Sequence, residues 1–316
     1  MQKRIPISLG PCIMLAIAIA APAQKTNRAV GRTPDGQPDL QGIWTNLTVT
    51  PLERPESLGL KATLSETEAA EFRRKALTAR AAVPVGLGEE WFDSGARVVS
   101  TLQTSLVVEP ANGRVPLTKT AEEIHANDVA HQGDSWEYMS TWDRCVARGV
   151  PGGMLPGTSN IGYQIIQTSG YVVIASEIIH EAHIIPLTDK HLPVDVKQLN
   201  GDSIGHWEGD TLVVDTTGYN GRGQIVTSLI AGRMNGMRES TQLHVVERLT
   251  RTAPDRIIYD VTIDDPVMYT SRWKVSLPFT RNDHYRIYEY ACHEGNLTTE
   301  HALQNARAAE KAAQRR

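Results

Sequence analysis

The sequence has no excess of positive charge and no block of lysine and arginine. Lys and Arg number 32 against 36 Asp and Glu, so the 316-residue chain has a formal net charge of −4. Affinity for a phosphate backbone depends on clustered basic side chains, and we therefore exclude nucleic acid as a partner. A hydrophobic fraction of 41% with a charged fraction of 22% is typical of a globular chain and excludes intrinsic disorder.

Long hydrophobic runs are absent except at the N-terminus. Residues 1–23 have the pattern of a secretory signal peptide: Lys3 and Arg4 come first, an apolar run covers 5–20, and Ala-Pro-Ala ends the segment at 21–23. This run is short and interrupted for a spanning helix. We expect an exported protein, periplasmic or secreted, that begins near Gln24 and has no stable membrane anchor after cleavage.

Cysteine is scarce, with three in the chain. Cys12 would leave with the signal peptide, and Cys145 and Cys292 would remain. An even count in an oxidising compartment favours a disulfide between these two. The alternative is a pair of reduced, buried thiols.

No repeat of fixed period is present, which argues against a propeller. Instead, short runs of alternating apolar and polar residues are separated by turn residues, as in 256–263. Such runs indicate antiparallel strands closed as a barrel or packed as a curved sheet. The fold class predicted is mainly β, a lipocalin-like antiparallel barrel or strongly curved sheet with peripheral helices. Strands are expected in the segment around 42–44 and at 106–108, 115–117, 163–167, 171–177, 183–187, 204–207, 211–215, 243–250, 256–263, 271–277 and 285–290.

Helices are expected in three places. Ser65 and Glu68 form a capping box that opens a helix to about 82, and Thr120 with Glu123 repeats the pattern for 121–131. A third helix covers 299–313. The domain organisation predicted is a signal peptide (1–23), an N-terminal arm with a capped helix (24–100), a β-barrel domain (101–297) and a C-terminal surface helix (298–316).

Several segments carry a resemblance to known families. PDLQGIW, GDSIGHWEGDTLVVDTT and YACHEGN resemble a family of exported bacterial proteins without an established activity, and the resemblance implies export and architecture only. That family commonly has arginine where His183 and His206 stand, which argues against a functional role for either imidazole. Gly-Ile-Trp at 42–44 more weakly resembles the entry strand of lipocalin-like barrels.

The densest group of titratable residues is Glu177, His180, Glu181 and His183. The flanking isoleucines favour a strand or tight turn, where the two histidines point in opposite directions, so we predict no metal site. His180 with Glu177 or Glu181 as its carboxylate partner is a candidate for acid–base catalysis. The competing interpretation is a hydrogen-bonded turn histidine.

A second group follows at 202–210. Asp202 and His206 are candidate catalytic residues at the mouth of the barrel beside His180, although Glu-Gly-Asp at 208–210 is also ordinary turn chemistry. Ser203 suggests a catalytic triad, but no nucleophile elbow surrounds it. Candidate ligand-binding aromatic residues are Trp91, Phe92, Tyr163 and Trp207.

Three functional hypotheses therefore stay open. The first is an exported barrel that binds a small apolar or aromatic molecule without chemistry. The second is an enzyme of the same shape that uses no cofactor and performs acid–base chemistry as a lyase, isomerase, cyclase or hydrolase. The third is a structural envelope protein.

Overall fold

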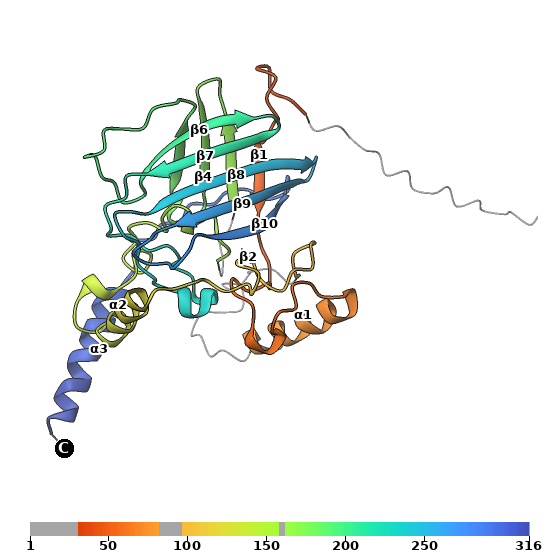
Figure 1. Cartoon of the computed structure of the whole chain (residues 1–316). Coiled ribbons are helices and arrows are strands. Elements are labelled where there is room, and N and C mark those ends of the chain that lie inside the picture. Colours follow the sequence, from red (N-terminus) through yellow and green to blue (C-terminus); the bar gives the residue numbers. More distant parts are fainter. Residues whose placement is uncertain (1–30, 82–96, 158–161, 316) are drawn as a thin grey trace, which may run out of the picture.

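Short strands with alternating burial form one antiparallel sheet (Figure 1). A computed structural model describes residues 31–81, 97–157 and 162–315. In this part of the chain the sheet has ten strands. These are β1 (Gly42–Thr45), β2 (Val107–Glu109), β3 (Gly162–Gln167), β4 (Tyr171–Ser176), β5 (Ala182–Pro186), β6 (Asp202–Glu208), β7 (Thr211–Thr217), β8 (His244–Ala253), β9 (Arg256–Asp264) and β10 (Trp273–Arg281).

The sheet curves until its two ends nearly meet. Its order is β5-β4-β3-β1-β10-β9-β8-β7-β6, and β2 pairs separately with β10. β5 and β6 then come together at one parallel bridge, between Leu187 and Gly205. A Cβ at Gly205 would lie 2.7 Å from Ile185 Cγ2, so only glycine permits this approach. The predicted barrel is confirmed, with one incompletely paired junction between β5 and β6 that we call the seam.

Apolar side chains fill the interior of the barrel. Ile257, Tyr259 and Val261 of β9 are fully buried, while the residues between them are only partly buried, which is the predicted two-residue period. Tyr163 and Tyr259 both pack against Phe279, with ring centroids 5.2 and 5.4 Å apart. Each such side chain stabilises the fold by about 1.5–3 kcal/mol through burial.

The N-terminal segment contributes a strand to the barrel. β1 lies between β3 and β10, and its Trp44 is completely buried. The Trp44 indole donates a hydrogen bond to the Leu40 carbonyl (2.8 Å), and the guanidinium groups of Arg251 and Arg281 lie 5.4 and 5.8 Å from the ring centroid. These contacts fix the entry of the chain into the sheet.

The helices are α1 (Glu66–Ala81), α2 (Lys119–Ala130) and α3 (Thr298–Ala313), all at the periphery of the sheet (Figure 1). The capping box of α1 is confirmed, because the Glu68 N–H donates to Ser65 Oγ (3.3 Å) and the Ser65 N–H donates to the Glu68 carboxylate (2.9 Å). α2 begins earlier than predicted. Its cap is Thr118, whose Oγ1 accepts from the Ala121 N–H at 3.1 Å.

Two predicted strands are absent from the described residues, at 115–117 and 285–290. In the first, the Val115 N–H donates to Glu53 Oε1 (2.7 Å), so it is unavailable to a strand ladder. In the second, the side chain of Tyr285 donates to Glu177 Oε2 (2.6 Å), and the carbonyl oxygen of Tyr290 lies within hydrogen-bond distance of His180 Nδ1 (3.0 Å). Side-chain partners therefore replace the strand pairing that the apolar residues suggested.

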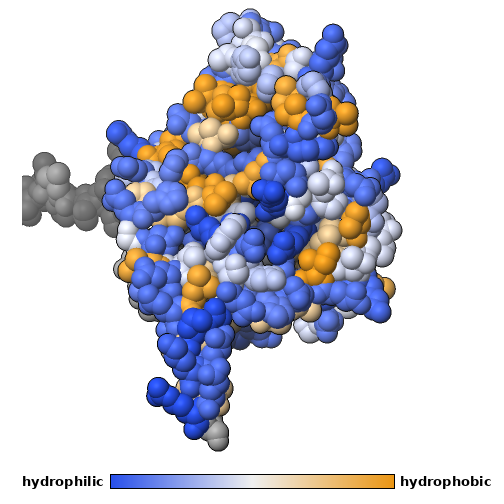
Figure 2. Space-filling view, turned by 90° about the vertical axis from the view of Figure 1, so that its left-hand side faces the viewer, coloured by the Kyte–Doolittle hydropathy of each residue, from blue (hydrophilic) through white to orange (hydrophobic). Residues whose placement is uncertain are grey.

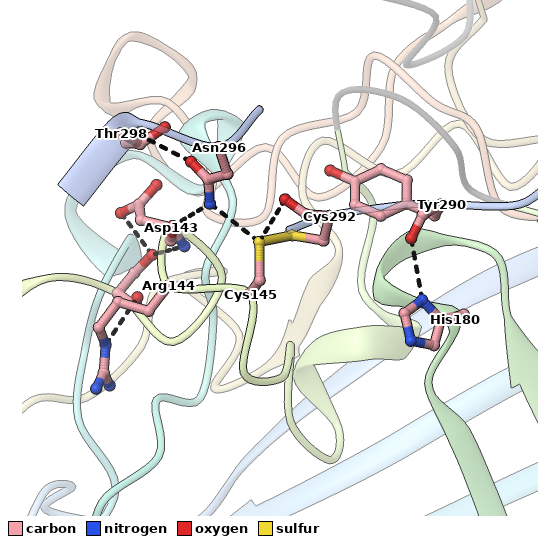
Figure 3. The surroundings of a disulfide bond; sticks show 9 residues. Asp143, Arg144, Cys145, His180, Tyr290, Cys292, Asn296 and Thr298 are labelled. Atoms are coloured by element: carbon pink, nitrogen blue, oxygen red, sulfur yellow. Dashed lines mark hydrogen bonds between the residues drawn. A yellow bond between two sulfur atoms is a disulfide. The ribbon is translucent and has the colours of Figure 1, made fainter. Parts of the chain in front are cut away.

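The predicted disulfide is formed. Cys145 and Cys292 are 147 positions apart, and their Cα atoms lie 5.6 Å from each other. The loop that they close contains β3 to β10, which is nearly the whole barrel. Asn296, at the start of α3, donates from Nδ2 to the Asp143 carbonyl beside the bridge (3.0 Å; Figure 3). The bridge thus joins the two ends of the barrel segment.

Candidate functional site

A cavity of about 280 Å³ lies at the seam, where the sheet is not closed by continuous strand pairing. We call it the seam cavity. Figure 2 shows the left-hand side of the molecule, which is hollowed near its middle with a mainly hydrophilic surface around the hollow. The lining of the seam cavity combines apolar and polar side chains, among them Val150, Met154, Ile174, His183, Asp202 and Ser203.

His183 crosses the seam by a side-chain hydrogen bond. It lies on β5, and its Nε2 is 2.8 Å from Ser203 Oγ on β6. Ser203 Oγ is in turn 2.8 Å from Thr216 Oγ1 on β7. Burial lowers the pKa of His183 to about 4, because the charged imidazolium would lose its hydration. His183 is therefore neutral at pH 7, and one of its ring nitrogens is free to act as a base.

Glu247 is the carboxyl group that faces this histidine. It lies on β8 with its side chain inside the barrel, and Tyr259 donates a hydrogen bond to its Oε1 (2.6 Å). Oε2 is 4.0 Å from His183 Nδ1, and within the described residues neither atom has a hydrogen-bond partner. Burial raises the pKa of Glu247 to about 7. The three side chains Ser203, His183 and Glu247 thus form a chain from the cavity wall into the barrel.

Asp202 takes part in a different network on the rim. Its Oδ2 is 2.8 Å from His191 Nδ1, and the other nitrogen of His191 is 2.9 Å from Asp215 Oδ1. His244 Nε2 is 2.8 Å from the second oxygen of Asp215, which lowers the pKa of Asp215 and raises that of His244. These exposed and half-buried groups hold the loop after β5 against β6 and β7.

The loop around 148–154 forms another wall of the seam cavity. The Arg148 N–H donates to Glu181 Oε2 (3.0 Å), and Asn200 Nδ2 donates to the other oxygen of Glu181. Arg148 is buried with its guanidinium over the Trp142 ring, 5.6 Å from its centroid. Glu181 therefore ties this loop to the segment that precedes β6.

The structure does not place the predicted pair Glu177 and His180 in the seam cavity. Glu177 is completely buried and accepts a hydrogen bond from Tyr285, whereas His180 is exposed with Nδ1 3.0 Å from the Tyr290 carbonyl (Figure 3). Ile179 and His180 both have positive φ, 60° and 45°, so the backbone turns sharply between the two predicted partners. His180 thus has the contacts of the hydrogen-bonded turn histidine considered above.

The other predicted site residues are dispersed. His206 is 54% exposed and lies 3.2 Å from Glu208, and Trp207 lines a separate hollow beside the N-terminal segment. Tyr163 is buried in the barrel with its hydroxyl donating to the Gly153 carbonyl (2.9 Å). Trp91 and Phe92 lie outside the described residues. Of the predicted catalytic residues, only Asp202 lines the seam cavity.

Comparisons with protein-family models, with curated proteins and with solved structures found no match to this chain. In the described residues, no group of three or more histidine, cysteine, aspartate or glutamate side chains is arranged to hold a metal ion. The helices in this same part of the chain lack the combination of length and apolar composition needed to cross a membrane.

Proposed function

We propose that this protein binds a small molecule in the seam cavity and acts on it by acid–base chemistry without a cofactor. The reaction that the geometry supports best is hydrolysis of a small ester. The observation that carries the proposal is the 2.8 Å contact between His183 Nε2 and Ser203 Oγ at the wall of the cavity, with Glu247 behind the imidazole. A serine, a histidine and a carboxylate in this order are the elements of nucleophilic catalysis on several unrelated folds.

The protonation state of Glu247 would determine which ring nitrogen of His183 carries the proton. When Glu247 is ionised, Nδ1 of His183 carries the proton that faces it, and Nε2 accepts the hydroxyl proton of Ser203. Ser203 Oγ then bonds to the carbonyl carbon of the ester while its proton passes to Nε2. The bond to the alcohol breaks, the alcohol takes the proton from Nε2, and water attacks the acyl-serine by the same route to release the acid.

The cavity favours a small, largely apolar or aromatic ester. The cavity volume of about 280 Å³ is just below the usual range for small-molecule sites, about 300–1,000 Å³. Val150, Met154 and Ile174 supply apolar surface, which would hold the acyl or alkyl part of the ligand. The resembled family commonly has arginine at the position of His183. The proposed ester hydrolysis would therefore occur only in those members that have histidine at this position.

Hydrolysis of p-nitrophenyl acetate by the purified protein tests this proposal. We expect turnover that rises with pH through about 7, as Glu247 ionises. Ser203→Ala and His183→Gln should each reduce kcat/KM by about 100-fold or more. His301→Gln, on α3, is the matched control and should not change the rate. Turnover that is absent, or equal in wild type and Ser203→Ala, would exclude catalysis by this serine.

The second candidate is binding without chemistry. It is favoured by the 4.0 Å separation of Glu247 Oε2 and His183 Nδ1, which is longer than a hydrogen bond. In that case the protein would retain a small molecule through purification and release it unchanged on denaturation, as mass spectrometry would show. The ester assay above separates the two candidates.

We also propose that the protein is exported to the periplasm or secreted. The Cys145–Cys292 disulfide supports this location, because disulfides persist in oxidising compartments. The predicted signal peptide lies outside the described residues. When the protein is expressed with its full N-terminus in a bacterium, it should be recovered outside the cytoplasm. Its intact mass should correspond to a chain that begins near Gln24. Recovery in the cytoplasm with residues 1–23 attached would contradict export.

A further inference from the structure

A second hollow, of about 670 Å³, is lined by Leu199, whose sequence neighbours Gln198 and Asn200 line the seam cavity, and the two share no lining residue. We call it the arginine groove. One wall comes from the segment on both sides of Cys145, and the other comes from Leu199 before β6, the loop after β7 and Arg238 before β8. The side chains that matter for its chemistry are Trp136, Tyr138, Arg144, Val146, Arg222 and Arg238.

The arginine groove concentrates positive charge in a protein whose formal net charge is −4. Arg238 forms an ion pair with Asp128, in which Nη2 donates to Oδ1 at 2.9 Å. Arg144 and Arg222 have no carboxylate within ion-pair distance in the part of the chain that the structure describes, and Glu137 is the acidic side chain that shares the lining. Two guanidinium groups are therefore available to an anion.

Arg144 is held where its charge is poorly compensated. Its guanidinium lies over Trp136, 5.2 Å from the ring centroid, and its Nε donates only a long hydrogen bond to the Ser140 carbonyl (3.4 Å). Burial lowers the pKa of Arg144, the nearby positive charge of Arg238 adds to this effect, and the negative charge of Asp143 opposes it in part. An anionic ligand would relieve both costs.

The apolar surface of the arginine groove is aromatic and exposed. Trp136 is 53% exposed, Val146 is 49% exposed, and Tyr138 lies beside them. Exposed aromatic rings next to unpaired arginines suit a ligand that combines a flat ring with an acidic group, since guanidinium binds carboxylate through two parallel hydrogen bonds.

The walls of the arginine groove are fixed before any ligand arrives. Arg144 precedes Cys145 of the disulfide, and Figure 3 shows its side chain directed away from the bridge. Asn296 holds the Asp143 carbonyl at 3.0 Å, and Ser135 caps the turn of Trp136 by accepting from the Glu137 N–H (3.3 Å). Preorganised side chains lose less entropy on binding.

From these contacts we propose that the arginine groove binds a small aromatic carboxylate. Arg144 and Arg222 contact the carboxylate, and Trp136 and Tyr138 contact the ring. This site is independent of the proposed chemistry at Ser203, since it uses none of the residues of the seam cavity.

Calorimetric titration of the mature protein with 2-naphthoate, and with the uncharged 2-naphthamide, tests the proposal. We expect naphthoate to bind about tenfold or more tightly than the amide, and Arg144→Gln and Arg222→Gln each to weaken naphthoate binding by about tenfold. The same variants should bind naphthamide as the wild type does. Arg73→Gln, which removes an exposed arginine of α1, is the control of equal charge and should leave both affinities unchanged.

Ser203→Ala separates this site from the seam cavity, and it should bind naphthoate like the wild type. The proposal is wrong if naphthoate binds no more tightly than naphthamide, if it gives no heat at millimolar concentration, or if both arginine variants keep the wild-type affinity. Thermal midpoints of the variants identify any loss of binding that comes from unfolding. If Arg144→Gln alone unfolds the protein, Arg222→Gln decides the result.

Discussion

Replacing Cys145 and Cys292 by serine is expected to lower the free energy of unfolding by about 2–4 kcal/mol, with about 5 kcal/mol as the limit of the chain-entropy account. The reason is the size of the closed loop, because 147 positions separate the two cysteines. Without the bridge, the unfolded chain gains the freedom of a segment that contains β3 to β10. Guanidinium unfolding monitored by tryptophan fluorescence, with and without the bridge, measures the difference.

Reduction of the wild-type protein provides the matched control. Unfolding in the presence of dithiothreitol should give the same midpoint as the double serine variant, which would then be insensitive to the reductant. Equal midpoints for wild type and variant in the absence of reductant would show that the bridge does not stabilise the fold. The effect also bears on the arginine groove, since Arg144 is adjacent to Cys145.

The strands that face solvent on one side were predictable from the sequence. In β9 the apolar positions alternate with polar ones, and the structure buries Ile257, Tyr259 and Val261 as that pattern requires. The closure of the barrel was not predictable in the same way. It involves one parallel bridge between Leu187 and Gly205 and the contact between His183 and Ser203. No local pattern in either segment encodes contacts between the two ends of the sheet.

The predicted pairing of His180 with Glu177 shows that neighbours in the sequence need not share a site. His180 has carboxylate neighbours in the sequence, but two consecutive residues with positive φ turn its side chain to the surface while Glu177 stays buried. Positive φ at a non-glycine residue is rare, and sequence alone gives no warning of it. The histidine that reaches the cavity is His183, two positions before Ile185 on the same face of β5.

Glu247 was missed although a signal existed. It occupies an inward position of β8, between Val245 and Leu249, where an apolar residue is the rule. The adjacent Val246 obscured this alternation, because two neighbouring valines do not reveal which one faces the core. A glutamate at an inward strand position destabilises the fold unless it has a hydrogen-bonding partner, so this position indicates a functional candidate as a histidine does. Tyr259 on β9, whose hydroxyl donates a hydrogen bond to Glu247, is that partner.

Glu247→Gln is expected to stabilise the protein at alkaline pH by about 3 kcal/mol, which corresponds to raising the carboxyl pKa from 4.5 to about 7 on folding. The folded state holds this proton more tightly than the unfolded state does. The contribution of Glu247 to the free energy of unfolding is therefore fully present below pH 4.5 and is lost as the pH rises through 7. Glutamine keeps the acceptor for Tyr259 and never ionises, so the variant should lack this decline.

His183 changes the free energy of unfolding with pH in the opposite direction to Glu247. Comparing the wild type with Glu247→Gln separates the effect of Glu247 from that of His183. Its pKa is lowered to about 4, so its contribution is lost as the pH falls from 6.5 towards 4, in wild type and variant alike. Urea unfolding at a series of pH values should give a difference between the proteins that grows from pH 4.5 to 7 and then stays constant. A constant offset between wild type and Glu247→Gln across this range would mean that Glu247 ionises normally inside the barrel, and the pH rise expected for ester hydrolysis would then have no source in this carboxylate.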